Sequence, residues 1–129
     1  MKMKYLFFSI ITTTLFFSCS EHKNQLVGEW KVYDVKTDFD ETRTTPQMLQ
    51  QVVDIEKQNR LKFVDDTSLL IIIKGNTYEA EWKMDANNVI HYYFKNDTTP
   101  HKLGKYNKPY IIATSKTKIG LMTTTYEKE

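Results

Sequence analysis

The chain has 129 residues, with 18 Lys and Arg against 16 Asp and Glu, and a single cysteine. This length suits one domain with a modest core, and a single cysteine leaves no partner for a disulfide or a cysteine-based metal site. The near balance of charge and the presence of only two arginines argue against nucleic-acid binding, which typically needs a strongly basic surface.

The first residues of the chain have the three-part layout of a secretory signal. Lys2 and Lys4 form a basic start, an apolar run covers Tyr5–Phe17, and Ser18 precedes Cys19. The apolar run is too short for a transmembrane helix, which needs about 20 apolar residues. Removal of this leader takes two lysines with it and leaves 16 basic and 16 acidic residues, so the basic isoelectric point belongs to the targeting segment.

A leader that ends in a small residue followed by cysteine resembles the leaders of bacterial lipoproteins. The resemblance implies that residues 1–18 are a signal peptide, that Cys19 carries the lipid, and that residues 19–25 form a short tether. It also implies an anchor in a membrane of the bacterial cell envelope, the outer membrane, with the protein facing the periplasm or the cell surface. An ordinary cleaved signal with a leftover thiol is the alternative.

The folded part is expected to begin with a strand and a helix. The Val, Trp and Tyr residues of Leu26–Lys36 favour a strand. A helix is expected over Pro46–Arg60, with Thr45 as its N-cap and the proline in its first position. Glu56 and Arg60 are expected to pair on its exposed face. Its apolar stripe, expected to be a packing face or a lid, consists of Met48, Leu49, Val52, Val53 and Ile55.

The rest of the chain is expected to be a series of short strands separated by turn residues. These strands are Leu61–Val64, Ser68–Lys74, Thr77–Met84, Val89–Lys95, Lys102–Tyr106, Pro109–Lys116 and Lys118–Tyr126. The most regular alternation is in Thr77–Met84, where every second residue is apolar, and Lys102–Tyr106 is expected to be a short edge strand. About seven or eight closely spaced strands favour an antiparallel barrel or sandwich.

The opening Leu26–Trp30, LVGEW, resembles the Gly-x-Trp entry strand of lipocalin-like domains. FVDDT at Phe63–Thr67, EWK at Glu81–Lys83 and the closing strand pair also resemble the small lipocalin-like domains of bacterial lipoproteins. The resemblance implies that residues 26–129 form a mainly β domain, a small antiparallel up-and-down barrel with one helix inserted after the first strand. It also implies that Trp30 lies on the barrel floor, packed against the core. The sequence departs from the family pattern in two places, at Asp66, where the family usually has glycine, and in the inserted helix. Because of these departures, the resemblance does not decide whether the barrel closes or whether it has a lumen.

The sequence contains no pattern that favours catalysis. The three histidines lack metal-ligand spacing, and His91 is expected on the polar face of its strand. Glu79 and Glu81 lie on one strand face, either as paired carboxylates or, with Lys83 beside them, as a solvated charged face. The adjacent aspartates that begin at Asp65 can touch a cation or cap backbone amides. We expect no enzyme activity, no cofactor and no metal.

Binding is the favoured functional class, because a barrel of this size either holds one small ligand or is filled by its own side chains. Six aromatic residues are expected inside, as core or as ligand-binding lumen residues: Trp30, Phe63, Tyr78, Trp82, Tyr92 and Phe94. One hypothesis is a membrane-anchored binder of a small hydrophobic ligand, for which a lumen of about 300 Å³ or more would argue. The other is a non-catalytic module that docks an envelope protein, for which a filled barrel with an exposed apolar patch would argue.

Overall fold

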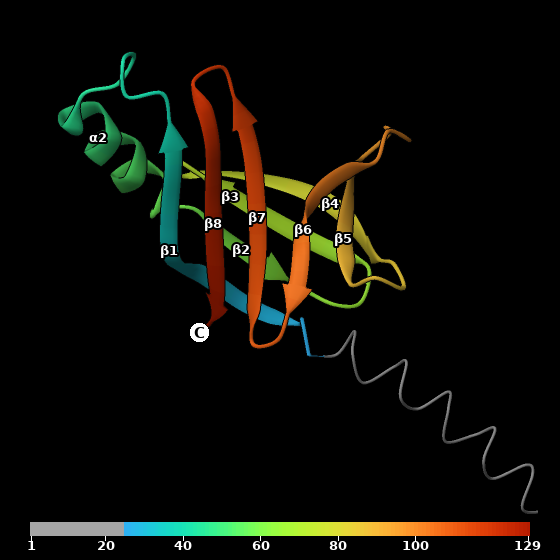
Figure 1. Cartoon of the computed structure of the whole chain (residues 1–129). Helices are drawn as coiled ribbons and strands as arrows, with labels where there is room; N and C mark the ends of the chain where they lie inside the picture. The colour runs from blue at the N-terminus through green and yellow to red at the C-terminus, as the bar shows by residue number, and fades with distance from the viewer. Residues whose placement is uncertain (1–24) are drawn as a thin grey trace, which may run out of the picture.

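Eight antiparallel strands close into a barrel in residues 25–129, the part of the chain that this computed structural model describes (Figure 1). Each strand pairs with the next along the chain, and β8 pairs with β1. The mainly β, up-and-down architecture expected from the sequence is therefore confirmed, and the barrel is closed. The segment expected to be a signal peptide, residues 1–18, and Cys19 lie outside the described residues. The elements are β1 (Gly28–Phe39), α2 (Pro46–Glu56), β2 (Arg60–Phe63), β3 (Ser68–Ile73), β4 (Asn76–Met84), β5 (Val89–Phe94), β6 (His101–Asn107), β7 (Tyr110–Thr117) and β8 (Gly120–Lys128).

The core fills one end of the barrel, where β1 begins; we call it the closed end. The Trp30 ring packs edge-on against Phe63 and Tyr106, with centroid distances of 6.5 and 6.2 Å, and Phe63 packs on Trp82 at 4.9 Å. The indole Nε1 of Trp30 donates a hydrogen bond of 2.8 Å to the carbonyl oxygen of Leu26. Trp30 thus packs against the core, as the lipocalin-like resemblance implied. The aliphatic residues buried around it are Leu26, Leu61, Leu69, Ile90 and Ile111.

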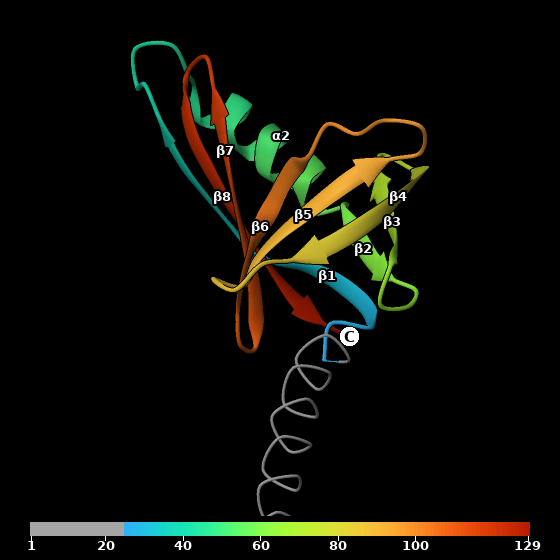
Figure 2. The same cartoon turned by 90° about the vertical axis from the view of Figure 1, so that its right-hand side faces the viewer.

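The other end of the barrel is open because several strands extend beyond the point where their pairing with a neighbouring strand ends. The pairing of β6 with β7 stops at Lys105–Ile112, whereas β7 and β8 stay paired as far as Thr117 and Gly120. On the other side, β2 pairs only with Gly28–Lys31 of β1. The far halves of β1, β7 and β8 therefore project as a three-stranded arm, which stands apart from β4, β5 and β6 in Figure 2.

Helix α2 begins as the sequence predicts, since the Thr45 side chain accepts a hydrogen bond of 3.2 Å from the Met48 amide and a proline occupies the first turn. It ends at Glu56 rather than at Arg60, because Arg60 begins β2 and pairs with Lys31 of β1. The expected pairing of Glu56 with Arg60 is therefore wrong, and the Arg60 guanidinium instead bonds to Glu129. The helix lies beside the arm at the open end (Figure 2).

The prediction that the sixth strand lies at an edge is also wrong. β6 pairs with β5 on one side and with β7 on the other, as closure of a barrel requires. The first strand runs to Phe39, beyond the expected Lys36, because β8 pairs with it along its whole far half. No helix within residues 25–129 has the length and apolar character needed to cross a membrane.

Candidate functional site

The open end of the barrel contains a cavity of about 250 Å³, which we call the mouth cavity. Side chains from α2, β2, β3, β5, β6, β7 and β8 and from the segment between α2 and β2 surround it. Its apolar lining comes mainly from Leu61, Ile71, Ile73, Leu103, Ala113 and Met122, and its polar or aromatic lining from Glu56, Asn59, Arg60, Tyr92, Lys102, Ser115 and Tyr126.

Exposure of the inward-facing side chains rises steadily from the closed end to the mouth. Along β3, Leu69, Ile71 and Ile73 share the inward face, and their exposures are 0%, 7% and 39%. Along β4, which runs the other way, Trp82 and Ala80 are 2% and 8% exposed. The barrel is thus solid at one end and hollow at the other, so an apolar lining is left accessible to a ligand only at the mouth.

The six aromatic residues expected inside fall into two groups. Trp30, Phe63 and Trp82 pack together at the closed end as core. Tyr92 lines the mouth cavity, while Tyr78 and Phe94 are 45% and 36% exposed near the open end. Alternation predicts the face of a strand that a residue occupies, but it does not predict how far along the barrel the residue lies.

An aromatic cluster at the mouth includes a residue that the sequence did not suggest. The His101 ring stacks on Tyr92 at a centroid distance of 5.1 Å and lies 5.4 Å from the ring of Phe94, which in turn packs edge-on against Tyr92. His101 lies directly opposite Tyr92 in the pairing of β5 with β6. This pairing joins two residues from separate strands, so no local spacing could have indicated it.

One wall of the mouth cavity is polar, and no pattern in the sequence indicates it. The hydroxyl of Thr124 donates a hydrogen bond of 2.9 Å to the Glu56 carboxylate. Burial, together with the negative charge of Glu56, raises the pKa of the Tyr126 hydroxyl well above its usual value, so Tyr126 stays a neutral hydrogen-bond donor. The side-chain oxygen of Asn59 is buried and accepts no hydrogen bond from any described residue. This wall can orient a ligand whose body contacts the apolar lining.

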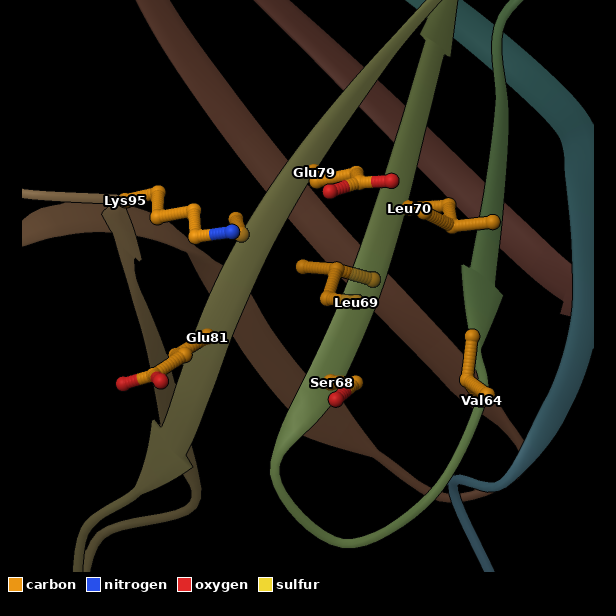
Figure 3. Close-up of a pocket in the computed structure, with 8 residues that line it drawn as sticks. Val64, Ser68, Leu69, Leu70, Glu79, Glu81 and Lys95 are labelled. Atoms are coloured by element: carbon orange, nitrogen blue, oxygen red, sulfur yellow. The ribbon is translucent and has the colours of Figure 1, made fainter.

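A second hollow lies on the outside of the barrel, over β3 and β4 (Figure 3). It has a volume of about 370 Å³, and we call it the outer groove. Val64 and Leu70 supply its apolar surface, and Lys95 reaches toward β4 near Glu79 and Glu81 in Figure 3. Both glutamates are exposed, which agrees with a solvated charged face.

The remaining polar candidates have structural roles. The Asp65 carboxylate accepts hydrogen bonds from the amides of Thr67 and Ser68, at 2.9 and 2.7 Å, and these bonds lower its pKa. Asp65 therefore caps backbone amides. His91 lies 3.3 Å from the Asp85 carboxylate on the outer face. Nowhere in residues 25–129 do three or more His, Asp or Glu side chains gather as they would around a metal ion.

Comparison with known proteins finds no matching family model, no matching curated protein and no matching solved structure.

Proposed function

We propose that this protein is a membrane-anchored envelope lipoprotein that binds a small hydrophobic ligand, without catalysis, in its mouth cavity. The observation that carries the proposal is the hollow half of an otherwise solid barrel. Small-molecule sites are typically concave and mostly apolar, with a few polar groups that fix orientation. The mouth cavity is concave, and it combines apolar side chains such as Leu103 and Met122 with the polar groups of the wall at Glu56 in similar proportion.

The volume of the mouth cavity limits the size of the proposed ligand. At about 250 Å³ the cavity is slightly smaller than the 300 Å³ expected of a typical site. An apolar cavity of about 150 Å³ accommodates benzene, so by proportion the mouth cavity encloses roughly ten non-hydrogen atoms. The proposed ligand is therefore a single-ring or short-chain compound, or the end of a longer molecule that protrudes from the mouth.

The proposed anchor is the acylated Cys19, joined to the barrel by residues 19–25. The described chain enters the barrel at its closed end, where the side chain of Gln25 accepts a hydrogen bond of 3.1 Å from Tyr106 and its carbonyl accepts one of 2.9 Å from Lys128. In this proposal the mouth cavity opens away from the membrane, since the tether joins the opposite end. A ligand would then enter from the aqueous side.

Native mass spectrometry of the protein purified from its source tests ligand binding. A small-molecule mass retained by several preparations supports the proposal, and bare protein in every preparation rejects it. The anchor is tested separately by Cys19→Ser, which should move the protein from the membrane fraction to the soluble fraction. Unchanged fractionation would refute lipid attachment at Cys19.

A second candidate function, docking of another envelope protein, is favoured by the outer groove. Val64 is 46% exposed there and lies beside Leu70, so the outside of the barrel carries an apolar surface as well. A photo-crosslinker placed at Val64 should capture one defined protein in the intact envelope, whereas the same crosslinker at Lys108, in the turn between β6 and β7, should not. Equal capture at both positions would reject specific docking.

A further inference from the structure

Two strand edges face each other without pairing where β6 and β7 separate toward the open end; we call this place the fork. β6 pairs with β7 only through Lys105–Asn107, although its pairing with β5 begins at His101. β7 pairs with β8 over its whole length, so Ala113–Thr117 has a partner on one side only. The two strands diverge visibly in Figure 1.

The vertex of the fork is set by Gly104. A Cβ atom added to Gly104 would lie 2.5 Å from the carbonyl oxygen of Ile112, so a side chain here would push the two strands apart. On the N-terminal side of Gly104, toward the open end, the register of β6 on β5 shifts, and β6 no longer pairs with β7. The open edges of the fork are therefore His101–Leu103 and Ala113–Thr117.

The hairpin geometry shows which backbone groups of β7 are free. The β7–β8 hairpin closes at Thr117 and Gly120 around a two-residue loop, in which the closing pair exchanges hydrogen bonds. Because bonded and non-bonded positions alternate, the amides of Ala113, Ser115 and Thr117 face β8, and those of Thr114 and Lys116 face the fork. Residues 114–117 are exposed, so these groups are accessible to another strand.

The outer side of the fork is basic. Lys102 and Lys105 of β6 and Lys116 of β7 are all exposed there. The ion pairs among the described residues involve other groups, so none of these three lysines forms an ion pair with an acidic side chain of residues 25–129. Lysines on a free edge oppose pairing with a second copy of the same edge. The same charges attract an acidic strand.

The inner side of the fork is different in character. Leu103 from one edge and Ala113 and Ser115 from the other line the mouth cavity. Successive side chains of a strand point to opposite faces. A strand laid along β7 would therefore place alternate side chains in the mouth cavity, against Leu103 and Ala113. The intervening side chains would lie beside Lys105 and Lys116 and near Lys102, which borders both the mouth cavity and the outer side.

We propose that the fork binds an extended peptide in which acidic and apolar residues alternate, added to β7 as an extra strand. Backbone hydrogen bonds to Thr114 and Lys116 provide affinity, and the cavity and the lysines select the side chains. This goes beyond small-ligand binding, because it needs the strand edge of β7 as well as the mouth cavity. The partner is a segment of another protein that is extended and acidic on one face.

The direct test uses the pentapeptide acetyl-Val-Glu-Phe-Glu-Val-amide, whose side-chain pattern is the same in both strand directions. Its addition to the purified protein should slow hydrogen exchange at the amides of Thr114 and Lys116 by roughly tenfold or more, because both become hydrogen-bonded. The charge-reversed peptide, with lysine in place of glutamate, should give no protection. No protection at about 1 mM of the acidic peptide, or equal protection by both peptides, overturns the proposal.

Two variants separate the backbone contribution from the charge. Thr114→Pro removes an amide that faces the fork and spares the ladder with β8, so it should abolish peptide binding in a folded protein. Lys116→Glu should weaken binding at least tenfold, whereas Lys108→Glu, at the other end of the β6–β7 hairpin, should not. Unchanged binding by Lys116→Glu would contradict the proposal even if Thr114→Pro fails to fold. If the amides of Thr114 and Lys116 are protected from hydrogen exchange without peptide, and this protection rises with protein concentration, the fork binds a second copy of this chain and the peptide proposal is wrong.

Discussion

Thr124 and Glu56 join the last strand to the only helix in residues 25–129. The Thr124 hydroxyl donates to the Glu56 carboxylate at 2.9 Å, although 68 residues separate the two in the chain. Thr124 is a buried polar residue, only 2% exposed, and Glu56 ends α2. This bond fixes the end of the helix against the arm and so determines the position of the polar wall of the mouth cavity.

Substitution of Thr124 by valine should therefore destabilise the protein although it preserves the shape of the side chain. The Glu56 carboxylate loses its donor, and loss of a hydrogen bond to a charged group costs about 1.5–3 kcal/mol in free energy of unfolding. Urea unfolding followed by tryptophan fluorescence measures the change. Thr123→Val, one residue earlier on the other face of β8, is the matched control. Equal effects of the two substitutions would show that the bond contributes nothing.

Trp30→Phe should reveal the contribution of the indole N–H at the closed end. The variant keeps an aromatic ring beside Phe63 and Tyr106 but leaves the buried carbonyl of Leu26 without its donor. A buried unsatisfied acceptor costs about 1–3 kcal/mol. Trp30→Ala should cost about 3–5 kcal/mol, because a cavity is added. Denaturant unfolding followed by circular dichroism measures both, and a Trp30→Phe variant as stable as the wild type would contradict the assigned role of this hydrogen bond.

The fold could be predicted from the sequence where local chemistry decides it. The alternation in Thr77–Met84 indicates a half-buried strand, and Thr45 before Pro46 indicates the start of a helix. The end of the helix could not be predicted, because no glycine or proline stops it. It ends where Arg60 pairs with Lys31 of β1, a contact that depends on the closed barrel.

The candidate site could be predicted only in part, for a related reason. Tyr92 and Trp82 face each other across β4 and β5 and share the inward face, yet only Tyr92 lines the mouth cavity. What distinguishes them is their neighbours, since Trp82 packs on Phe63 in the core, whereas Tyr92 stacks on His101. Both of these neighbours come from other strands. The polar wall combines Glu56 with Thr124, and no spacing in the sequence indicates such a distant pair.

Acid should destabilise the protein through carboxylates that cap turns. Hydrogen bonds from the Thr67 and Ser68 amides lower the pKa of Asp65, and one from the Val89 amide does the same for Asp85. Because the folded state lowers these pKa values, the stabilisation is present above the unfolded value near 4 and is lost as pH falls through the folded value.

Thermal unfolding between neutral pH and about pH 2 measures this loss. Asp65→Asn should flatten the fall in melting temperature below about pH 4, since an amide oxygen still accepts hydrogen bonds but does not titrate in this range. Asp66→Asn, in the same turn, is the control, because the amide bonds are made by Asp65. An unchanged acid slope in Asp65→Asn would contradict the capping role.

Filling the mouth cavity should abolish ligand binding and leave the fold intact. Ala113 lines the cavity from β7, so Ala113→Leu places three additional carbon atoms in the space proposed for the ligand. Ala86→Leu adds the same atoms at an exposed turn between β4 and β5 and serves as the control. A ligand that binds only the folded state raises the melting temperature of the protein. Toluene or p-xylene should therefore raise the melting temperature of the wild type and of Ala86→Leu but not that of Ala113→Leu. The same rise in all three proteins would place the binding of these compounds outside the mouth cavity.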